Sequence, residues 1–142
     1  MSKIKCSYLG KLNCEAIHLQ SGNRIITDAP LDHCGKGENF SPTDLLATSL
    51  GTCLLTIMAI KYKSNGWELN NIFLTVEKLM SNNKERKINS LLIDIYIPNN
   101  YSEEKINFLK EASRDCPVTR NISESMEIKI SWHYKKGNNN CY

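Results

Sequence analysis

Two cysteines, Cys53 and Cys116, stand where thiol chemistry could take place. Cys53 lies in the middle of the most apolar stretch of the chain, residues 45–58, and Cys116 opens a Cys-Pro-Val turn after a second predicted helix. A reactive cysteine needs its thiolate, which requires a helix N-terminus, a cation or a base nearby. If the two cysteines meet in space, we expect thiol redox chemistry. If they do not, Cys53 is a small core residue.

Cys116 meets the requirement for a reactive thiol better than Cys53 does. Pro117 suits the first position of a helix, so Cys116 would be the N-cap at the positive end of the helix dipole, and Arg114 and Arg120 are close in sequence. Cys53 lies about twelve residues past the start of its helix, where the dipole has faded, and would need a cation from elsewhere in the fold. An inert buried thiol remains the alternative for each.

Composition and charge exclude several classes of protein. A chain of 142 residues fits one domain, residues 1–142, with its own core. Its net charge of +3 and scattered lysines do not predict a nucleic-acid partner. The first eight residues lack the apolar segment of a signal peptide, and no stretch reaches the roughly 18 uninterrupted apolar residues of a membrane span. We therefore expect a cytoplasmic protein with no membrane partner.

The sequence context of the other four cysteines gives less indication of a function. In a reducing compartment six cysteines do not indicate a disulfide framework, and the histidines show no metal-ligand spacing, so we expect no structural zinc. Cys34, next to His33 in a glycine-containing loop, is interpreted as an incidental loop residue, with a reactive surface thiol as the alternative. Cys6 and Cys14 are predicted to pack within strands, and Cys141 to be exposed in the polar tail.

Hydrophobic periodicity and turn residues predict the order of the elements. Strands are expected at 3–9, 14–19 and 24–27, a long helix at 42–63, strands at 67–78 and 88–97, a helix at 102–114, a short helix or turn after 116–118, and a last strand at 126–134. This order is typical of an α+β fold, with antiparallel sheets around a long central helix.

The long helix has the most clearly marked start in the chain. Ser41 is the expected cap, Pro42 takes the first helical position, and Asp44 places an acid near the positive end of the dipole. The middle of the helix is apolar around most of its circumference, so we expect it to be buried on several sides. Because a small monomer seldom surrounds a helix that fully, the pattern favours a homodimer.

The sequence around the two cysteines resembles the OsmC/Ohr family. Residues 35–53, which contain the Ser-Pro helix start and end at Cys53, are similar to the family's helix motif, and a second Cys-Pro follows about sixty residues later at Cys116. The order of strands and helices also fits, and residues 24–30 and 77–80 are similar to the broad OsmC-like branch. The resemblance implies an OsmC-like fold and an intertwined homodimer with shared active sites at the subunit interface.

What the resemblance further implies is a thiol peroxidase that acts on hydroperoxides, preferably organic ones, without a cofactor. Carried over, Cys53 is the peroxidatic residue, whose thiolate attacks the O–O bond and becomes a sulfenic acid. Cys116 would then form a Cys53–Cys116 disulfide, which an external dithiol would reduce. The alternatives are a non-enzymatic module on the same scaffold that binds small molecules or senses redox state, and a structural protein with inert thiols.

The chain departs from the family pattern at the groups that activate the peroxidatic thiolate. In well-studied members an arginine activates the thiolate, and a glutamate near the start of the long helix holds that arginine. Here Thr43 takes the glutamate's place and Asp44 follows it. Asp44 lies about 180° from Cys53 around the helix, which favours a capping role over a supporting one. Arg24, the arginine that precedes the long helix, is the candidate for the activating cation.

Overall fold

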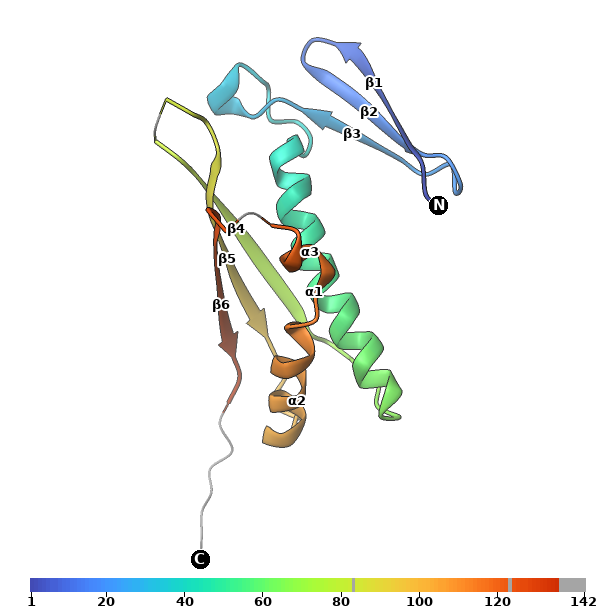
Figure 1. The fold of residues 1–142 in the computed structure, drawn as a ribbon, viewed down its shortest axis with the longest axis vertical. Coiled ribbons are helices and arrows are strands. Elements are labelled where there is room, and N and C mark those ends of the chain that lie inside the picture. Colours follow the sequence, from blue (N-terminus) through green and yellow to red (C-terminus); the bar gives the residue numbers. More distant parts are fainter. Residues whose placement is uncertain (83, 123, 136–142) are drawn as a thin grey trace, which may run out of the picture. The chain divides into compact units, whose positions relative to one another are not determined.

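The computed structural model describes residues 1–82, 84–122 and 124–135 of the chain (Figure 1). The chain forms two compact units, Met1–Leu46 and Ala47–Tyr142. Their elements, in chain order, are β1 (Ile4–Gly10), β2 (Asn13–His18), β3 (Arg24–Asp28), the 3₁₀ helix η1 (Leu31–His33), α1 (Pro42–Ser64), β4 (Phe73–Met80), β5 (Ile88–Tyr96), α2 (Glu103–Ser113), α3 (Pro117–Arg120) and β6 (Glu127–His133). The prediction of a single domain over residues 1–142 stays a prediction.

The first unit is an antiparallel meander of β1, β2 and β3, as the turn residues predict. The tight connection between β1 and β2 requires positive φ angles at three successive residues, and Gly10 takes the largest of them, 90°. After β3 the loop folds back on Asp28, whose Oδ2 accepts hydrogen bonds from the amides of Lys36 and Glu38, both at 3.2 Å. This loop leads to the start of α1.

The second unit contains the main core. Its sheet has the order β4-β5-β6, and the alternate β5 residues Leu91, Ile93 and Ile95 are at most 1% exposed. Residues of α1 and α2 pack with them in one buried cluster. The α+β fold class is therefore confirmed.

One detail of the second sheet differs from the predicted antiparallel arrangement. Strand β6 pairs with β5 in parallel, with Ile93 opposite Ile130. The connection from β5 to β6 runs through α2 and α3 (Figure 1). A helical crossover of this kind returns the chain in its original direction, whereas a short hairpin would have reversed it.

The strand predicted at 67–78 begins later, at Phe73. Trp67 instead joins an aromatic cluster, with ring centroids 4.9 Å from Tyr62 and 5.5 Å from Phe108. Asn71 has a positive φ of 56°, which interrupts the extended backbone. The partly buried Trp67 ring thus packs in this cluster instead of continuing a strand.

The buried residues of helix α1 form one stripe, and this stripe packs on the sheet. Its buried residues recur at helical spacing on one side: Ala47, Leu50, Gly51, Leu54, Met58 and Tyr62. Ile60, by contrast, is 59% exposed. The expectation of burial on several sides included a partner subunit and stays a prediction, because the single chain buries one side of the helix.

Helix α1 is also long and apolar enough to cross a membrane, judged by length and composition alone. The core helix of a soluble protein passes the same test, and α1 contributes to a core here. The observation is weak evidence for a span, and the expectation that the protein has no membrane partner stays a prediction.

Candidate functional site

The structure brings Cys53 and Cys116 together. Cys53 lies in the middle of α1, and Cys116 directly precedes α3. Their side chains are in hydrogen-bonding contact. Cys116 is fully buried, whereas Cys53 is partly exposed. The two residues therefore form a pair in which Cys53 has exposed surface and Cys116 has none.

The short helix α3 places Cys116 as its N-cap. Pro117 occupies the first turn, where its missing amide proton costs nothing, and the extended backbone of Cys116 (φ −62°, ψ 115°) is the conformation expected of a cap. The sulfur makes no full side-chain capping hydrogen bond. The amides of Val118 and Thr119 nevertheless lie near enough to stabilise a negative charge on it. Pro117 predicts this position of Cys116 from the sequence, and the structure confirms it.

The surroundings of Cys116 favour its thiolate. Burial, the largest influence, raises the pKa of the Cys116 thiol, but the nearby Thr119 hydroxyl, the Cys53 thiol and the amides of Thr119 and Val118 lower it. Together these donors outweigh burial, so the pKa of Cys116 lies below its ordinary value. The result agrees with the expectation that Cys116 is the better-placed thiol.

The pKa of Cys53 moves in the opposite direction. Burial is the largest cause of its raised pKa, and the hydrogen bond to Cys116 raises it further, while the amide of Val118 lowers it in part. The two thiols interact and titrate as a pair, with the lower pKa on Cys116 and the higher pKa on Cys53.

The two residues proposed to support Cys53 lie in the first unit. Arg24 begins β3, and its Nη1 lies 3.2 Å from Glu15 Oε1 on the neighbouring strand. Asp44 Oδ2 accepts hydrogen bonds from Ser41 N at 2.8 Å and from Ser41 Oγ at 2.7 Å, and Asp44 N donates to Ser41 Oγ at 3.1 Å. These reciprocal bonds form a capping box, so Asp44 does cap α1. The supporting roles of Arg24 and Asp44 at Cys53 stay predictions.

The other cysteines lie apart from this pair along the chain. Cys34 is exposed and ends η1 with a positive φ of 65°. Cys14 is partly buried on β2, but Cys6 is exposed, so its predicted packing role is wrong for the single chain because its side chain is turned to solvent. Cys141 lies outside the described residues.

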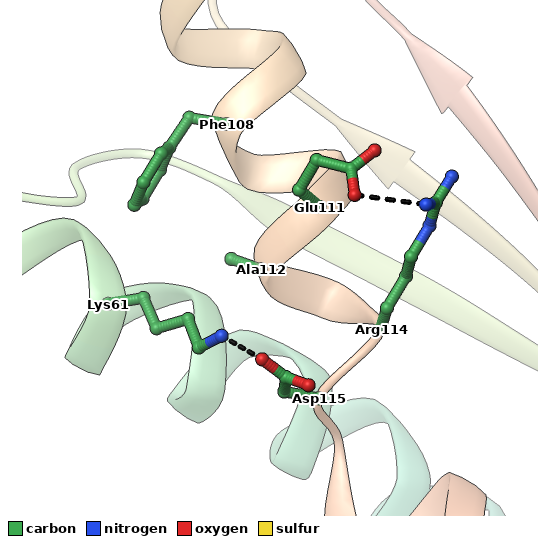
Figure 2. A pocket seen from close by; sticks show the side chains of 6 residues that line it. All are labelled: Lys61, Phe108, Glu111, Ala112, Arg114 and Asp115. Carbon is green, nitrogen blue, oxygen red and sulfur yellow. Dashed lines mark hydrogen bonds and ion pairs between the residues drawn. The ribbon is translucent and has the colours of Figure 1, made fainter.

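A cavity of about 360 Å³ lies beside the turn that carries Cys116. Figure 2 shows two ion pairs among its lining residues, Lys61 with Asp115 and Arg114 with Glu111. Asp115, the residue before Cys116, also accepts a bond from Arg120 Nη2 at 2.8 Å through its other oxygen. Its carboxylate therefore lies between two cations.

Sequence reasoning did not identify Thr119 or the Lys61–Asp115 pair. Thr119 could have been found, because Pro117 marks the helix start and the third helical residue commonly faces the cap. Lys61 and Asp115 are 54 positions apart, and no local pattern connects them. Only the tertiary fold reveals that contact.

The comparisons with known proteins identify the family. The sequence profile described as "OsmC-like protein" matches residues 35–131, a span that includes both cysteines. A protein of Psychrobacter arcticus 273-4, provisionally named an osmotic stress induced and detoxification response protein, is 39% identical with a TM-score of 0.86, over 94% of this chain and 96% of that one. The chain belongs to the OsmC-like protein family.

Two more distant structures share the fold. An OsmC-like protein from Mycoplasma pneumoniae has a TM-score of 0.78 at 18% identity, over 96% of this chain and 98% of that one. An organic hydroperoxide resistance protein OsmC from Legionella pneumophila has a TM-score of 0.70 at 16% identity, over 93% of this chain and 96% of that one. No curated protein matches the chain.

Proposed function

We propose that this protein is a thiol-dependent peroxidase that reduces hydroperoxides, preferably organic ones. The observation that carries the proposal is the contact between Cys53 and Cys116, with one sulfur partly exposed and the other buried. Membership of the OsmC-like family supports it, as does the name of the Legionella pneumophila relative. No metal or organic cofactor takes part in the proposed reaction.

In the first step the partly exposed Cys53 sulfur attacks the O–O bond of the hydroperoxide. Its proton passes to the Cys116 thiolate, to which it is already hydrogen-bonded. A new S–O bond forms, the O–O bond breaks, and the alkoxide leaves with the electron pair and takes up the proton held by Cys116. The Cys53 sulfur is oxidised by two electrons to a sulfenic acid, and the peroxide is reduced to an alcohol.

In the second step the regenerated Cys116 thiolate attacks the Cys53 sulfenic acid. An S–S bond forms, and the S–O bond breaks to release hydroxide, which becomes water with a proton from solvent. An external dithiol then reduces the Cys53–Cys116 disulfide by thiol–disulfide exchange. Its thiolate attacks Cys53, the more exposed sulfur, and Cys116 leaves as the better-stabilised thiolate.

The proposal includes a homodimer with shared active sites and a cytoplasmic location. Each unit exposes apolar side chains that a second chain could cover, among them Ile25 and Ile26 in the first unit and Ile60 and Phe73 in the second. A reducing cytoplasm would return the disulfide to thiols between turnovers.

Hydroperoxide consumption in the presence of a dithiol tests the function. We expect the wild type to consume cumene hydroperoxide faster than hydrogen peroxide, and Cys53→Ser to abolish turnover. Cys116→Ser lacks the base as well as the second thiol, so it should consume the first equivalent more slowly than the wild type and form no Cys53–Cys116 disulfide. The exposed Cys34→Ser variant is the matched control and should behave as wild type. A wild type that forms the disulfide in redox buffer but consumes no peroxide would contradict the proposal and favour a redox-sensing module.

A further inference from the structure

The ion pair between Lys61 and Asp115 joins the two elements that carry the redox cysteines. Lys61 lies on α1 and Asp115 immediately precedes Cys116. Cys53, Ile57 and Lys61 follow one another at four-residue spacing, so they lie along one face of α1. Long helical side chains lean back toward the helix N-terminus, which brings the Lys61 ammonium toward the level of Cys53.

The Asp115 carboxylate is held from both sides. Lys61 Nζ contacts Oδ2, as Figure 2 shows, and Arg120 Nη2 donates to Oδ1 at 2.8 Å. The Arg120 contact stays within the turn that includes Cys116 and α3, whereas the Lys61 contact crosses to α1. Of the two cations that contact Asp115, Lys61 is therefore the one that can fix the distance between the two sulfurs.

Among the described residues, the backbone hydrogen bonds of the turn run to the end of α2 and, from Arg120 N to Cys116 O at 3.4 Å, to α3. Asp115 N donates to Ala112 O at 3.2 Å, and Cys116 N donates to Ser113 O at 3.3 Å. Neither bond reaches α1, so neither sets where Cys116 lies relative to Cys53. A disulfide bond needs a narrow range of sulfur positions, and a displacement of about 1 Å can slow a reaction on the order of a hundredfold.

We propose that Lys61 and Asp115 are positioning residues that hold Cys116 against Cys53 for disulfide formation. The inference rests on the proposed function for its biological use, but the position of the thiols can be measured without peroxide. In a glutathione buffer, the Cys53 and Cys116 thiols reduce oxidised glutathione to two molecules of reduced glutathione and form one S–S bond. Two protons and two electrons pass from the protein to glutathione in this exchange.

The equilibrium constant of that exchange tests the inference. Linked and unlinked Cys53 and Cys116 peptides would be quantified by mass spectrometry after equilibration of the full chain at fixed pH. We expect Lys61→Met to lower the constant about tenfold, because misplaced thiols have a lower effective concentration. A tenfold change corresponds to about 30 mV for a two-electron couple. Asp115→Asn should lower it by a similar factor.

A double variant separates positioning from unrelated effects. If the two residues act through one contact, the double variant with Lys61→Met and Asp115→Asn should have an equilibrium constant no lower than that of the more strongly affected single variant. Arg114→Met is the matched control, since it removes the Arg114–Glu111 pair of the same cavity, which lies between neighbouring residues of one helix end (Figure 2). Its constant should stay within about twofold of the wild type, because exposed pairs of this kind contribute little.

Failure of this inference can be distinguished from failure of the proposed function. Constants for Lys61→Met and Asp115→Asn within twofold of the wild type, with folding unchanged by circular dichroism, would overturn the inference. So would a decrease of equal size in Arg114→Met. A wild type that consumes no peroxide would contradict the proposed function alone, because the glutathione equilibrium would still report whether Lys61 positions the pair.

Discussion

At the scale of single residues, the two thiols of the candidate site are not equivalent. Cys116 is buried, but the donors around it lower the pKa of its thiol, whereas burial and the neighbouring Cys116 raise the pKa of Cys53. In the proposed reaction the Cys116 thiolate serves both as the base that takes the proton of Cys53 and as the leaving group when a dithiol reduces the disulfide. A leaving thiol of low pKa departs faster. The proposal thus assigns contact with the substrate to Cys53 and the negative charge to Cys116.

Substitution of Thr119 tests whether its hydroxyl lowers the pKa of Cys116. Its hydroxyl donates to the Cys116 sulfur and stabilises the thiolate. Thr119→Val keeps the shape but removes the donor, so we expect the pKa of Cys116 to rise and its thiolate to appear only at higher pH. Thr119→Ser should restore the wild-type behaviour. The measurement is the thiolate absorbance at 240 nm against pH, taken as a difference from the Cys116→Ser protein; identical curves for the valine and serine variants would contradict the role.

At the scale of elements, the start of α1 and its packing on the sheet determine where Cys53 lies. The capping box of Ser41 and Asp44 fixes the first turn. Further along, Gly51 allows a close approach to β4, because a Cβ at this position would lie 2.9 Å from both Leu74 Cδ1 and Val76 Cγ2. Gly51 lies two residues from Cys53, so its close packing on β4 positions Cys53 without touching the sulfur.

Asp44→Ala tests whether this residue caps the helix or supports the thiol. We expect a loss of about 1 kcal/mol in the free energy of unfolding, measured by urea denaturation, because the variant removes the acceptor for Ser41. The rate at which iodoacetamide alkylates Cys53 should be unchanged. A slower alkylation without a loss of stability would instead assign Asp44 to the site.

Gly51→Val tests the close contact between α1 and β4. We expect a loss of about 1–3 kcal/mol in the free energy of unfolding, since the added carbons must displace Leu74 or the stiff, branched Val76. Thr56→Val, an exposed position on the same helix, is the control and should stay within about 0.5 kcal/mol. Equal effects in the two variants would show that the helix, rather than the contact, responds to valine.

The sequence predicted those elements whose boundaries depend on local chemistry. Ser41-Pro42 marks the start of α1, and Pro117 marks the start of α3, because a cap and a proline act within one helical turn. Contacts that are distant in sequence were not predictable in this way. The parallel pairing of β6, the burial of Trp67 and the Lys61–Asp115 pair all depend on how the elements pack.

The same distinction applies to the candidate site. The motif pointed to both cysteines, and the cap at Cys116 followed from Pro117. The sequence did not show which of the two thiols has the lower pKa. That difference results from the burial of each cysteine and from the donors that surround it. The resemblance also implied an activating arginine, and Arg24 stays the candidate.

At the scale of the whole molecule, we expect a homodimer. The apolar side chains that each unit leaves exposed, such as Ile60 on α1, are the basis of this expectation. Sedimentation equilibrium or light scattering over a range of concentrations should give a mass of about twice the 16.2 kDa of one chain. A mass of one chain at micromolar concentration would contradict it and would leave the exposed residues without a covering subunit.

The central claim is that Cys53 and Cys116 form one redox pair that reduces hydroperoxides. The most direct measurement adds one equivalent of an organic hydroperoxide to the reduced protein and maps the disulfides by mass spectrometry. We predict a Cys53–Cys116 link in the wild type and a trapped Cys53 sulfenic acid in Cys116→Ser. If both thiols remain unmodified, or if the link joins other cysteines, the account is wrong.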